Sequence, residues 1–267
     1  MRLRIGLALV IALAAVALLA PLLTPYPPAA QLDLHTLRAA PPSFAHPAGT
    51  DLYSRDLLSR LVYGARISLI IAVLAVVISV TLGTLVGLLA GYAGGLADAV
   101  LMRIVDAGLA VPKMFVVLVV LALWEGVTIP ALIGMIGLTG WFGVSRIVRA
   151  EVAAAREREY VGAARAAGAS PVRIAFRHIL PNVTGPIIVT AAMGVGQVVL
   201  LEAGLSYLGI GVPQPTPSWG NIIADGQHVL LSAPWIATGA GLAIIVTVLA
   251  FSILGDGLRE HLDPRSA

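Results

Sequence analysis

The sequence of 267 residues is 58% hydrophobic and only 12% charged, and its mean hydropathy is +0.94. Soluble domains are about 45–50% apolar and about 25% charged, so this composition excludes a water-soluble globule and a disordered chain. The formal charge of +3 is small. Because a membrane-spanning helix takes about 20 apolar residues, we expect an all-α membrane protein with room for about six spans.

Several kinds of site are excluded by residue types that are absent or isolated. The chain has no cysteine, which excludes disulfides, iron–sulfur clusters and thiolate metal sites. Its one lysine, Lys113, follows Pro112 and therefore cannot belong to a phosphate-binding Walker loop. The five histidines form no i,i+4 pair, so we predict no metal site. We expect a chain that is not an enzyme and holds no cofactor, with any nucleotide bound by another subunit.

Six apolar runs are expected to form the membrane-spanning helices. They cover residues 5–23, 67–90, 98–124, 128–149, 183–205 and 235–258. The first run could be a signal peptide, but it is longer than the usual apolar core of about 7–15 residues, which favours an uncleaved helix. Pro112 is expected to kink the third span. Glycines at positions 83, 87, 91 and 95 favour close helix packing.

The chain is expected to divide into three parts: a first transmembrane helix over residues 1–24, an external loop over residues 25–65, and a five-helix core over residues 66–262. The external loop reads as amphipathic from Asp51 to Arg60, which predicts an interfacial helix with an Asp56–Arg60 pair. The alternative is a solvent-exposed helix that leads into the second span.

The arginines predict the orientation of the chain in the membrane. They gather near both termini and between residues 146 and 177, and the positive-inside rule assigns such segments to the cytoplasm. We therefore expect both termini and the loop over residues 151–182 inside. The loop over residues 206–234, with three prolines from position 213 to 217, is expected outside.

The loop over residues 151–182 is predicted to form a helix, a tight turn and a second helix. Residues 151–167 are rich in helix formers, and Gly168 is placed to end that helix in the left-handed conformation. Ser170 is the expected N-cap of the second helix. DNA binding is disfavoured, because both ends are tied to the membrane and the charges alternate in sign. The small residues of the first helix favour docking of a peripheral subunit over a merely structural hairpin.

Three motifs in one order resemble the permeases of binding-protein-dependent ABC importers. The first is similar to the EAA loop of that family: Ala163, Ala164, Gly168, Leu180 and Pro181 fall on its pattern, and Gly162 stands where the family has glutamate. The nearest carboxylate is Glu159. Residues 46–68 and 205–221 resemble the matching segments of dipeptide, oligopeptide and nickel permeases.

The resemblance implies a type I importer permease, a bundle of six transmembrane helices with a cytoplasmic coupling loop, in the bacterial inner membrane. The implied partners are a second homologous permease in a heterodimer, two cytoplasmic ATPase subunits that bind ATP and magnesium, and an external solute-binding protein, with no nucleic acid. The loop residues implied to contact an ATPase are Glu159, Tyr160, Gly162, Ala163, Ala164, Gly168, Leu180 and Pro181.

The resemblance also implies import of dipeptides or oligopeptides, with nickel or another small solute as the alternative. A secondary transporter or channel acting alone is a different class. Such proteins often show inverted repeats, and this sequence shows none.

Four charged residues within the expected spans are candidates for the translocation pathway: Arg103, Asp106, Lys113 and Glu202. A charge in a span costs at least about 2.5–3.5 kcal/mol, which makes each a functional candidate. Arg103 and Asp106 are three residues apart, which favours an internal ion pair. Lys113 is expected to face the pathway, where it would favour solutes with a carboxylate, or to reach the headgroups. Glu202 is the candidate partner of Lys113 within the chain. Alternatively, Glu202 is a gate, a contact for the amine of the substrate, or a hydrogen-bonded carboxylate at a helix end.

Overall fold

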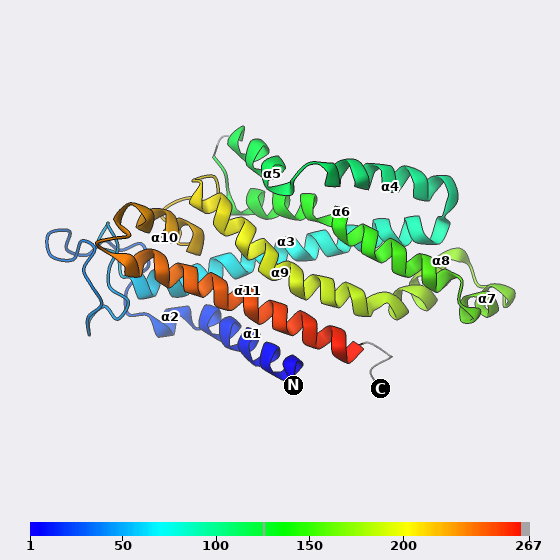
Figure 1. The fold of residues 1–267 in the computed structure, drawn as a ribbon, viewed down its shortest axis with the longest axis horizontal. Coiled ribbons are helices and arrows are strands. Elements are labelled where there is room, and N and C mark those ends of the chain that lie inside the picture. Colours follow the sequence, from blue (N-terminus) through cyan, green and yellow to red (C-terminus); the bar gives the residue numbers. More distant parts are fainter. Residues whose placement is uncertain (125, 263–267) are drawn as a thin grey trace.

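The computed structural model describes residues 1–124 and 126–262, and every regular element in these ranges is a helix (Figure 1). The α-helices are α1 (Arg2–Leu18), α2 (Ala20–Leu23), α3 (Leu57–Ala93), α4 (Gly95–Ala110), α5 (Lys113–Ala122), α6 (Ile129–Arg156), α7 (Glu159–Ala166), α8 (Pro171–Arg173), α9 (Thr184–Tyr207), α10 (Trp219–Gly226) and α11 (Pro234–Leu262). A π-helix (Ile174–Ile179) and a 3₁₀ turn (Leu180–Val183) join α8 to α9. The predicted all-α fold class is confirmed.

Four helical segments are long and apolar enough to cross a membrane: α3, α6, the run Pro171–Tyr207 that ends in α9, and α11. The pair α4 and α5 adds a fifth span if it is counted as one. The first expected span is divided into α1, of 17 residues, and α2. Of the six expected spans, four correspond to helical segments of spanning length, and a fifth corresponds to the bent pair α4 and α5. The first expected span, α1 with α2, falls below that length.

The break between α4 and α5 confirms the kink expected at Pro112. The two helices are bent by 75° relative to each other. Val111 has an extended backbone (φ −101°, ψ 128°), as the proline ring requires of the residue before it. The break places the start of α5 inside the apolar part of the chain.

The α3–α6 contact is the most extensive helix contact in the described residues, and glycines make it possible. A Cβ added at Gly83 would lie 2.5 Å from Cβ of Val144, and one at Gly87 would lie 2.7 Å from the carbonyl oxygen of Ser145. A Cβ added at Gly91 would lie 2.7 Å from the carbonyl oxygen of Arg149. The predicted packing stripe is confirmed at these three positions. Gly95 has no neighbour within 4 Å and instead begins α4 with φ +54°.

The helices α1 and α11 run side by side, with α9 on the other side of α11 (Figure 1). A Cβ at Gly6 would lie 2.5 Å from the amide nitrogen of Leu254, and one at Gly257 would lie 2.4 Å from that of Leu3. An exposed Arg2–Glu260 ion pair of 2.6 Å joins the two helices near the termini. The N-terminal helix is thus packed tightly onto the bundle.

No separate helix precedes α3 within residues 25–56, which corrects the expected interfacial helix at residues 51–60. The helix begins at Leu57 and continues through the second expected span to Ala93. Asp56 is its N-cap and accepts a hydrogen bond from the amide of Ser59. The carboxylate of Asp56 is therefore occupied at the helix start, and the expected Asp56–Arg60 pair is not formed.

Candidate functional site

The segment that we call the elbow, residues 157–183, projects from one end of the bundle and contains α7 and α8 (Figure 1). It departs from the predicted continuous helix over residues 151–167. Helix α6 ends at Arg156, and α7 starts anew at Glu159. The chain turns here because Val161, Ile174 and Ile179 are buried against Val152 and its neighbours in α6.

A small apolar core fixes the elbow to α3 and α6. Its buried members are Leu88, Val144, Val148, Val152, Ala155, Val161, Ile174, Ala175, Ile179 and Val183. This cluster is separate from the larger core that joins α3, α9 and α11. The elbow is therefore held in one orientation relative to the bundle and can transmit a displacement to α6.

The outward face of the elbow consists mostly of small side chains. The predicted loop residues Glu159, Tyr160, Gly162, Ala163, Gly168 and Pro181 are exposed, and Ala164 and Leu180 are half-buried. A Cβ added at Gly162 would meet no atom within 4 Å, so the missing glutamate of the resembling pattern leaves open space. Glu159 lies in the first turn of α7, where a carboxylate is favourable to the helix dipole.

The turn between α7 and α8 has the predicted geometry. Gly168 has φ +78°, in the left-handed region that favours glycine. The hydroxyl of Ser170 accepts a hydrogen bond from the amide of Arg173, and Pro171 is the first residue of α8. Local sequence signals were sufficient to predict this turn.

Lys113 lies at the first position of α5, beside the α3–α6 contact. A Cβ added at Gly140 would lie 3.0 Å from the ammonium nitrogen of Lys113 and 2.2 Å from the hydroxyl of Ser79. Gly140 is the twelfth residue of α6, about 17 Å along its axis from Ile129. The ammonium is therefore near the middle of the bundle, and it has no ion-pair partner within the described ranges.

The expected ion pair between Arg103 and Asp106 is not formed. Asp106 instead pairs with Arg146 of α6 at 3.5 Å, and both side chains are exposed by more than half. Asp98 accepts a hydrogen bond of 2.9 Å from Nε of Arg149. These contacts join α4 to α6 around an open pocket of about 460 Å³ near the elbow. Arg146 and Arg149 of α6 reach the acidic side chains of α4, so Asp106 and Asp98 pair across the two helices.

Glu202 is fully buried inside the subunit, and its partners are serines rather than Lys113. Its carboxylate accepts hydrogen bonds from the hydroxyls of Ser68 at 2.9 Å and Ser206 at 2.6 Å. The hydroxyl of Ser206 also accepts from the amide of Val212. Of the interpretations considered for Glu202, the geometry favours the hydrogen-bonded carboxylate at a helix end, which ties α3 to α9 and the following loop.

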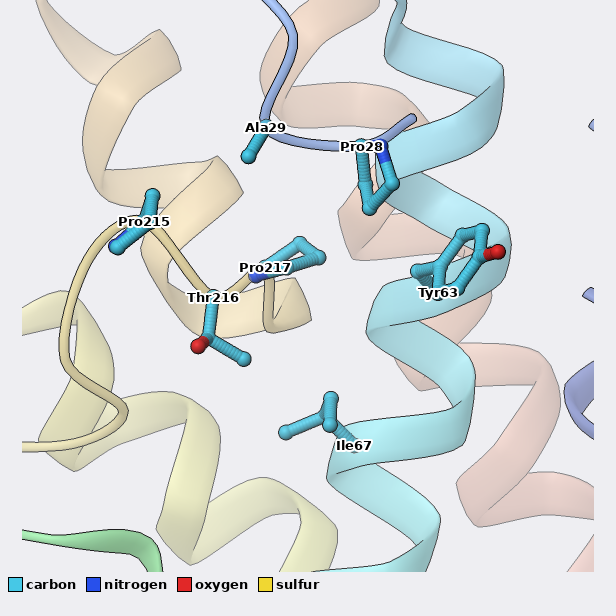
Figure 2. A pocket seen from close by; sticks show the side chains of 7 residues that line it. All are labelled: Pro28, Ala29, Tyr63, Ile67, Pro215, Thr216 and Pro217. Atoms are coloured by element: carbon cyan, nitrogen blue, oxygen red, sulfur yellow. The ribbon is translucent and has the colours of Figure 1, made fainter. Parts of the chain in front are cut away.

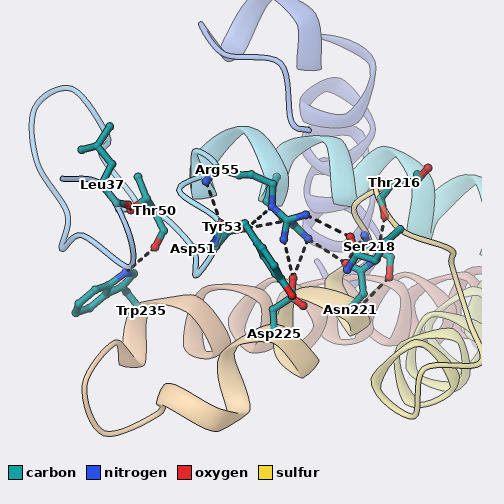
Figure 3. Close-up of polar contacts among 12 residues, drawn as sticks. Leu37, Thr50, Asp51, Tyr53, Arg55, Thr216, Ser218, Asn221, Asp225 and Trp235 are labelled. Carbon is teal, nitrogen blue, oxygen red and sulfur yellow. Dashed lines mark hydrogen bonds and ion pairs between the residues drawn. The ribbon is translucent and has the colours of Figure 1, made fainter. Parts of the chain in front are cut away.

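A buried ionic network at the opposite end was not predicted from the sequence (Figure 3). Asp51 accepts from Nε of Arg55 at 2.6 Å and from Nη1 of Arg60 at 3.0 Å. Asp225 of α10 accepts from Arg55 at 3.0 Å and from Arg60 at 3.2 Å. The network joins the segment before α3 to α10, and the only sequence signal for it was the cluster of charges at residues 51–60.

The two acids and two arginines of this network neutralise each other away from water. Arg60 is 0% exposed and Asp51 is 1% exposed. Gln214 and Asn221 add neutral acceptors to the guanidinium groups at 3.3 and 3.4 Å. Burial raises the pKa of Asp225 above the usual range of a carboxyl group, against the opposing attraction of Arg55.

An apolar pocket of about 250 Å³ opens at the same end of the bundle (Figure 2). Tyr63 and Ile67 of α3 form one side, and the loop Pro215–Pro217 forms the other. Pro28 and Ala29 lie across its top in the view of Figure 2. Trp219, which follows this loop in the chain, is buried, and its indole donates to the carbonyl of Leu61 at 3.0 Å. These contacts order the proline-rich loop against the start of α3.

Residues 83–267 match the family described as "Binding-protein-dependent transport system inner membrane component". The chain belongs to this family. The stretch from Gly83 onward includes α4 to α11, and therefore the elbow, the broken span and most of the bundle.

Curated relatives of the same family match over nearly the whole chain. The dipeptide transport system permease protein DppC of Escherichia coli (strain K12) is 44% identical over 98% of this chain and 88% of its own length. A proposed peptide transport system permease protein of Brucella suis biovar 1 is 42% identical over 98% of this chain and 87% of its own length. The chain is accordingly an ABC importer permease, and the resemblance of its three motifs is confirmed.

Within residues 1–124 and 126–262 the structure holds no group of three or more histidine, cysteine or acidic side chains that could bind a metal ion. The buried charges found here form structural networks, and the elbow is the projecting part of the molecule. The candidate functional surfaces of this permease are therefore the elbow and the broken span formed by α4 and α5.

Proposed function

We propose that this protein is one of two permease subunits of an ATP-driven importer of dipeptides or oligopeptides in the bacterial inner membrane. The high identity to permeases named for dipeptide and peptide transport supports the substrate class. The second permease is a homologue with which this chain forms a heterodimer around the pathway. An external binding protein delivers the peptide.

The elbow is the proposed docking site for a cytoplasmic ATPase, and its geometry is the observation that carries this function. Its outer face presents small side chains over which another protein can approach the backbone, and its inner face is anchored in the cluster around Val152 and Ile179. An ATPase that moves the elbow therefore moves α6, and with it α3. Energy enters in this way because the chain has no Walker loop of its own.

With an ATPase docked on the elbow, the elbow and both termini are proposed to lie in the cytoplasm. The Arg2–Glu260 pair joins the start of α1 to the last turns of α11. Arg158, Arg165, Arg173 and Arg177 are exposed in or beside the elbow, in accord with the positive-inside rule. At the other end Arg55 and Arg60 are buried and neutralised by Asp51 and Asp225, so they present little exposed positive charge.

The experiment is purification of the assembled importer in mild detergent with Ala163→Trp in this chain. Ala163 is exposed on α7 in an ordinary helical conformation, so the bulky ring strains no backbone and acts only on a partner. We expect loss of the ATPase subunits from the purified complex, with the permease still in the membrane. Gly168→Trp should act in the same direction and adds backbone strain at φ +78°.

The matched control is Ala45→Trp, an exposed alanine at the opposite end of the chain. It should co-purify with the ATPases as the wild type does. Retention of the ATPases by both Ala163→Trp and Gly168→Trp, with normal uptake, would overturn the docking role. Concentrative uptake by this chain alone would indicate a secondary transporter instead.

A further inference from the structure

The ammonium group of Lys113 is a positive charge near the middle of the bundle, and no carboxylate within residues 1–124 and 126–262 pairs with it. Its nitrogen lies against Gly140, about 17 Å from the first residue of α6 along the helix axis. The hydrocarbon core of a bilayer is about 30 Å thick, so a group about 17 Å along a spanning helix is expected well inside the apolar layer. The side chain is half-buried and directed toward α3 and α6, and does not reach for the headgroups.

Within the described ranges, the acidic side chains that could balance Lys113 have other hydrogen-bond or ion-pair partners. Glu202 accepts from Ser68 and Ser206. Asp106 pairs with Arg146, and Asp98 pairs with Arg149 at the elbow end. Glu125 lies outside the described residues, so its variant is included in the test below. A cation in this position calls for an anion, because an unbalanced charge at this depth costs several kcal/mol.

The broken span adds further positive character at the same place. Lys113 is the first residue of α5, which begins after Pro112 and runs for 10 residues. The first amides of a helix have no intrahelical acceptor and carry the positive end of its dipole. The ammonium and the start of α5 therefore favour the same kind of ligand, a small anionic group.

We infer that Lys113, at the start of α5, binds the C-terminal carboxylate of the peptide as it crosses the membrane. This inference rests on the proposed function, since it names the group of the peptide that the pathway recognises. A peptide in water carries an N-terminal ammonium and a C-terminal carboxylate, and only the carboxylate is complementary to Lys113. A hydrogen-bonded contact of this kind to a charged group favours the free acid over its amide by about tenfold or more.

The test uses the complete importer in proteoliposomes with enclosed ATP. Uptake of dialanine and of its C-terminal amide is measured for the wild type, Lys113→Met and Lys113→Arg. We expect Lys113→Met to lower uptake of dialanine about tenfold relative to wild type and to leave uptake of the amide unchanged. Lys113→Arg should retain most of the uptake of dialanine, because it keeps the charge. Arg4→Met, which removes an exposed cation from α1, is the control and should have no effect.

A second measurement avoids any selection by the binding protein. Labelled dialanine is equilibrated with the detergent-purified permease–ATPase complex alone, and Lys113→Met should weaken its binding about tenfold. The inference would be overturned if Lys113→Met lowered uptake of dialanine and of its amide equally, or if it changed neither binding nor uptake. It would also be overturned if Glu125→Gln lowered uptake of dialanine as much as Lys113→Met does. A wild-type importer that transports neither compound would instead overturn the proposed function.

Discussion

The guanidinium of Arg60 and the carboxylate of Asp51 form an ion pair of 3.0 Å in which neither side chain is more than 1% exposed. Asp225, 165 residues further along the chain, accepts from the same guanidinium. This pair connects the first turn of α3 to the segment before it and to α10. The end of the bundle opposite the elbow is therefore fixed by charge as well as by apolar packing.

Arg60→Met should destabilise the protein by about 3–5 kcal/mol, because it leaves the buried carboxylate of Asp51 and the half-buried carboxylate of Asp225 with one guanidinium between them. Thermal unfolding of the detergent-purified chain measures the loss. Arg38→Met is the control, since Arg38 is exposed and has no ion pair in the described part of the chain, and it should change the free energy of unfolding by less than about 0.5 kcal/mol. Equal midpoints for the two variants would contradict the role given to the network.

Acidification should stabilise the wild type relative to Asp225→Asn. Burial raises the pKa of Asp225 in the folded protein, so the folded state takes up this proton at a higher pH than the unfolded chain does. The contribution is present in full below the unfolded pKa and is lost as the pH rises through the folded pKa. Unfolding midpoints of both proteins between pH 7.5 and pH 4.5 measure the difference. A wild type that loses stability relative to Asp225→Asn on acidification would show that Arg55 and Arg60 dominate instead.

Gly87→Ala should separate α3 from α6 and destabilise the protein by about 1–3 kcal/mol, as overpacking does. The added methyl would lie 2.7 Å from a backbone carbonyl, which cannot rotate away as a side chain can. Gly143→Ala on α6 is the matched control. It meets no atom within 4 Å and should be neutral or stabilising, because alanine is the better helix former. Thermal unfolding again compares the two, and a neutral Gly87→Ala would contradict the close contact.

Glu202→Gln should retain uptake, because an amide oxygen still accepts from one of the two serine hydroxyls. Glu202→Leu should cost about 1–3 kcal/mol, since both buried hydroxyls lose their acceptor. Uptake by proteoliposomes and unfolding of the purified protein are measured for both variants. Loss of uptake in a stable Glu202→Gln protein would mean that the negative charge itself acts in transport.

Features set by local sequence could be predicted, and contacts between distant segments could not. Pro112, Gly168 and the glycine stripe beginning at Gly83 act on their own turn or helix face, and the structure confirms each. The i,i+4 rule assigned Arg60 to Asp56, but Asp56 is engaged as the N-cap of α3. Arg60 is then free to bind Asp225 of α10, which no local pattern connects to it.

The same limit applies to the elbow and the broken span. The end of α6 at Arg156 has no glycine or proline to predict it, and the turn follows from burial of Val161 in the elbow core. Asp106 was assigned to Arg103 on its own helix, whereas the structure pairs it with Arg146 on α6. The candidate loop residues were identified by their resemblance to a family motif, and their function in coupling stays a prediction.

The most direct test of the account is uptake of radiolabelled dialanine by proteoliposomes that contain the assembled importer, measured with and without enclosed ATP. We predict accumulation against a gradient only when this chain, its partner permease, the ATPases and ATP are all present, and loss of that accumulation in Ala163→Trp. Accumulation by this chain without an ATPase, or undiminished accumulation in Ala163→Trp, would contradict it.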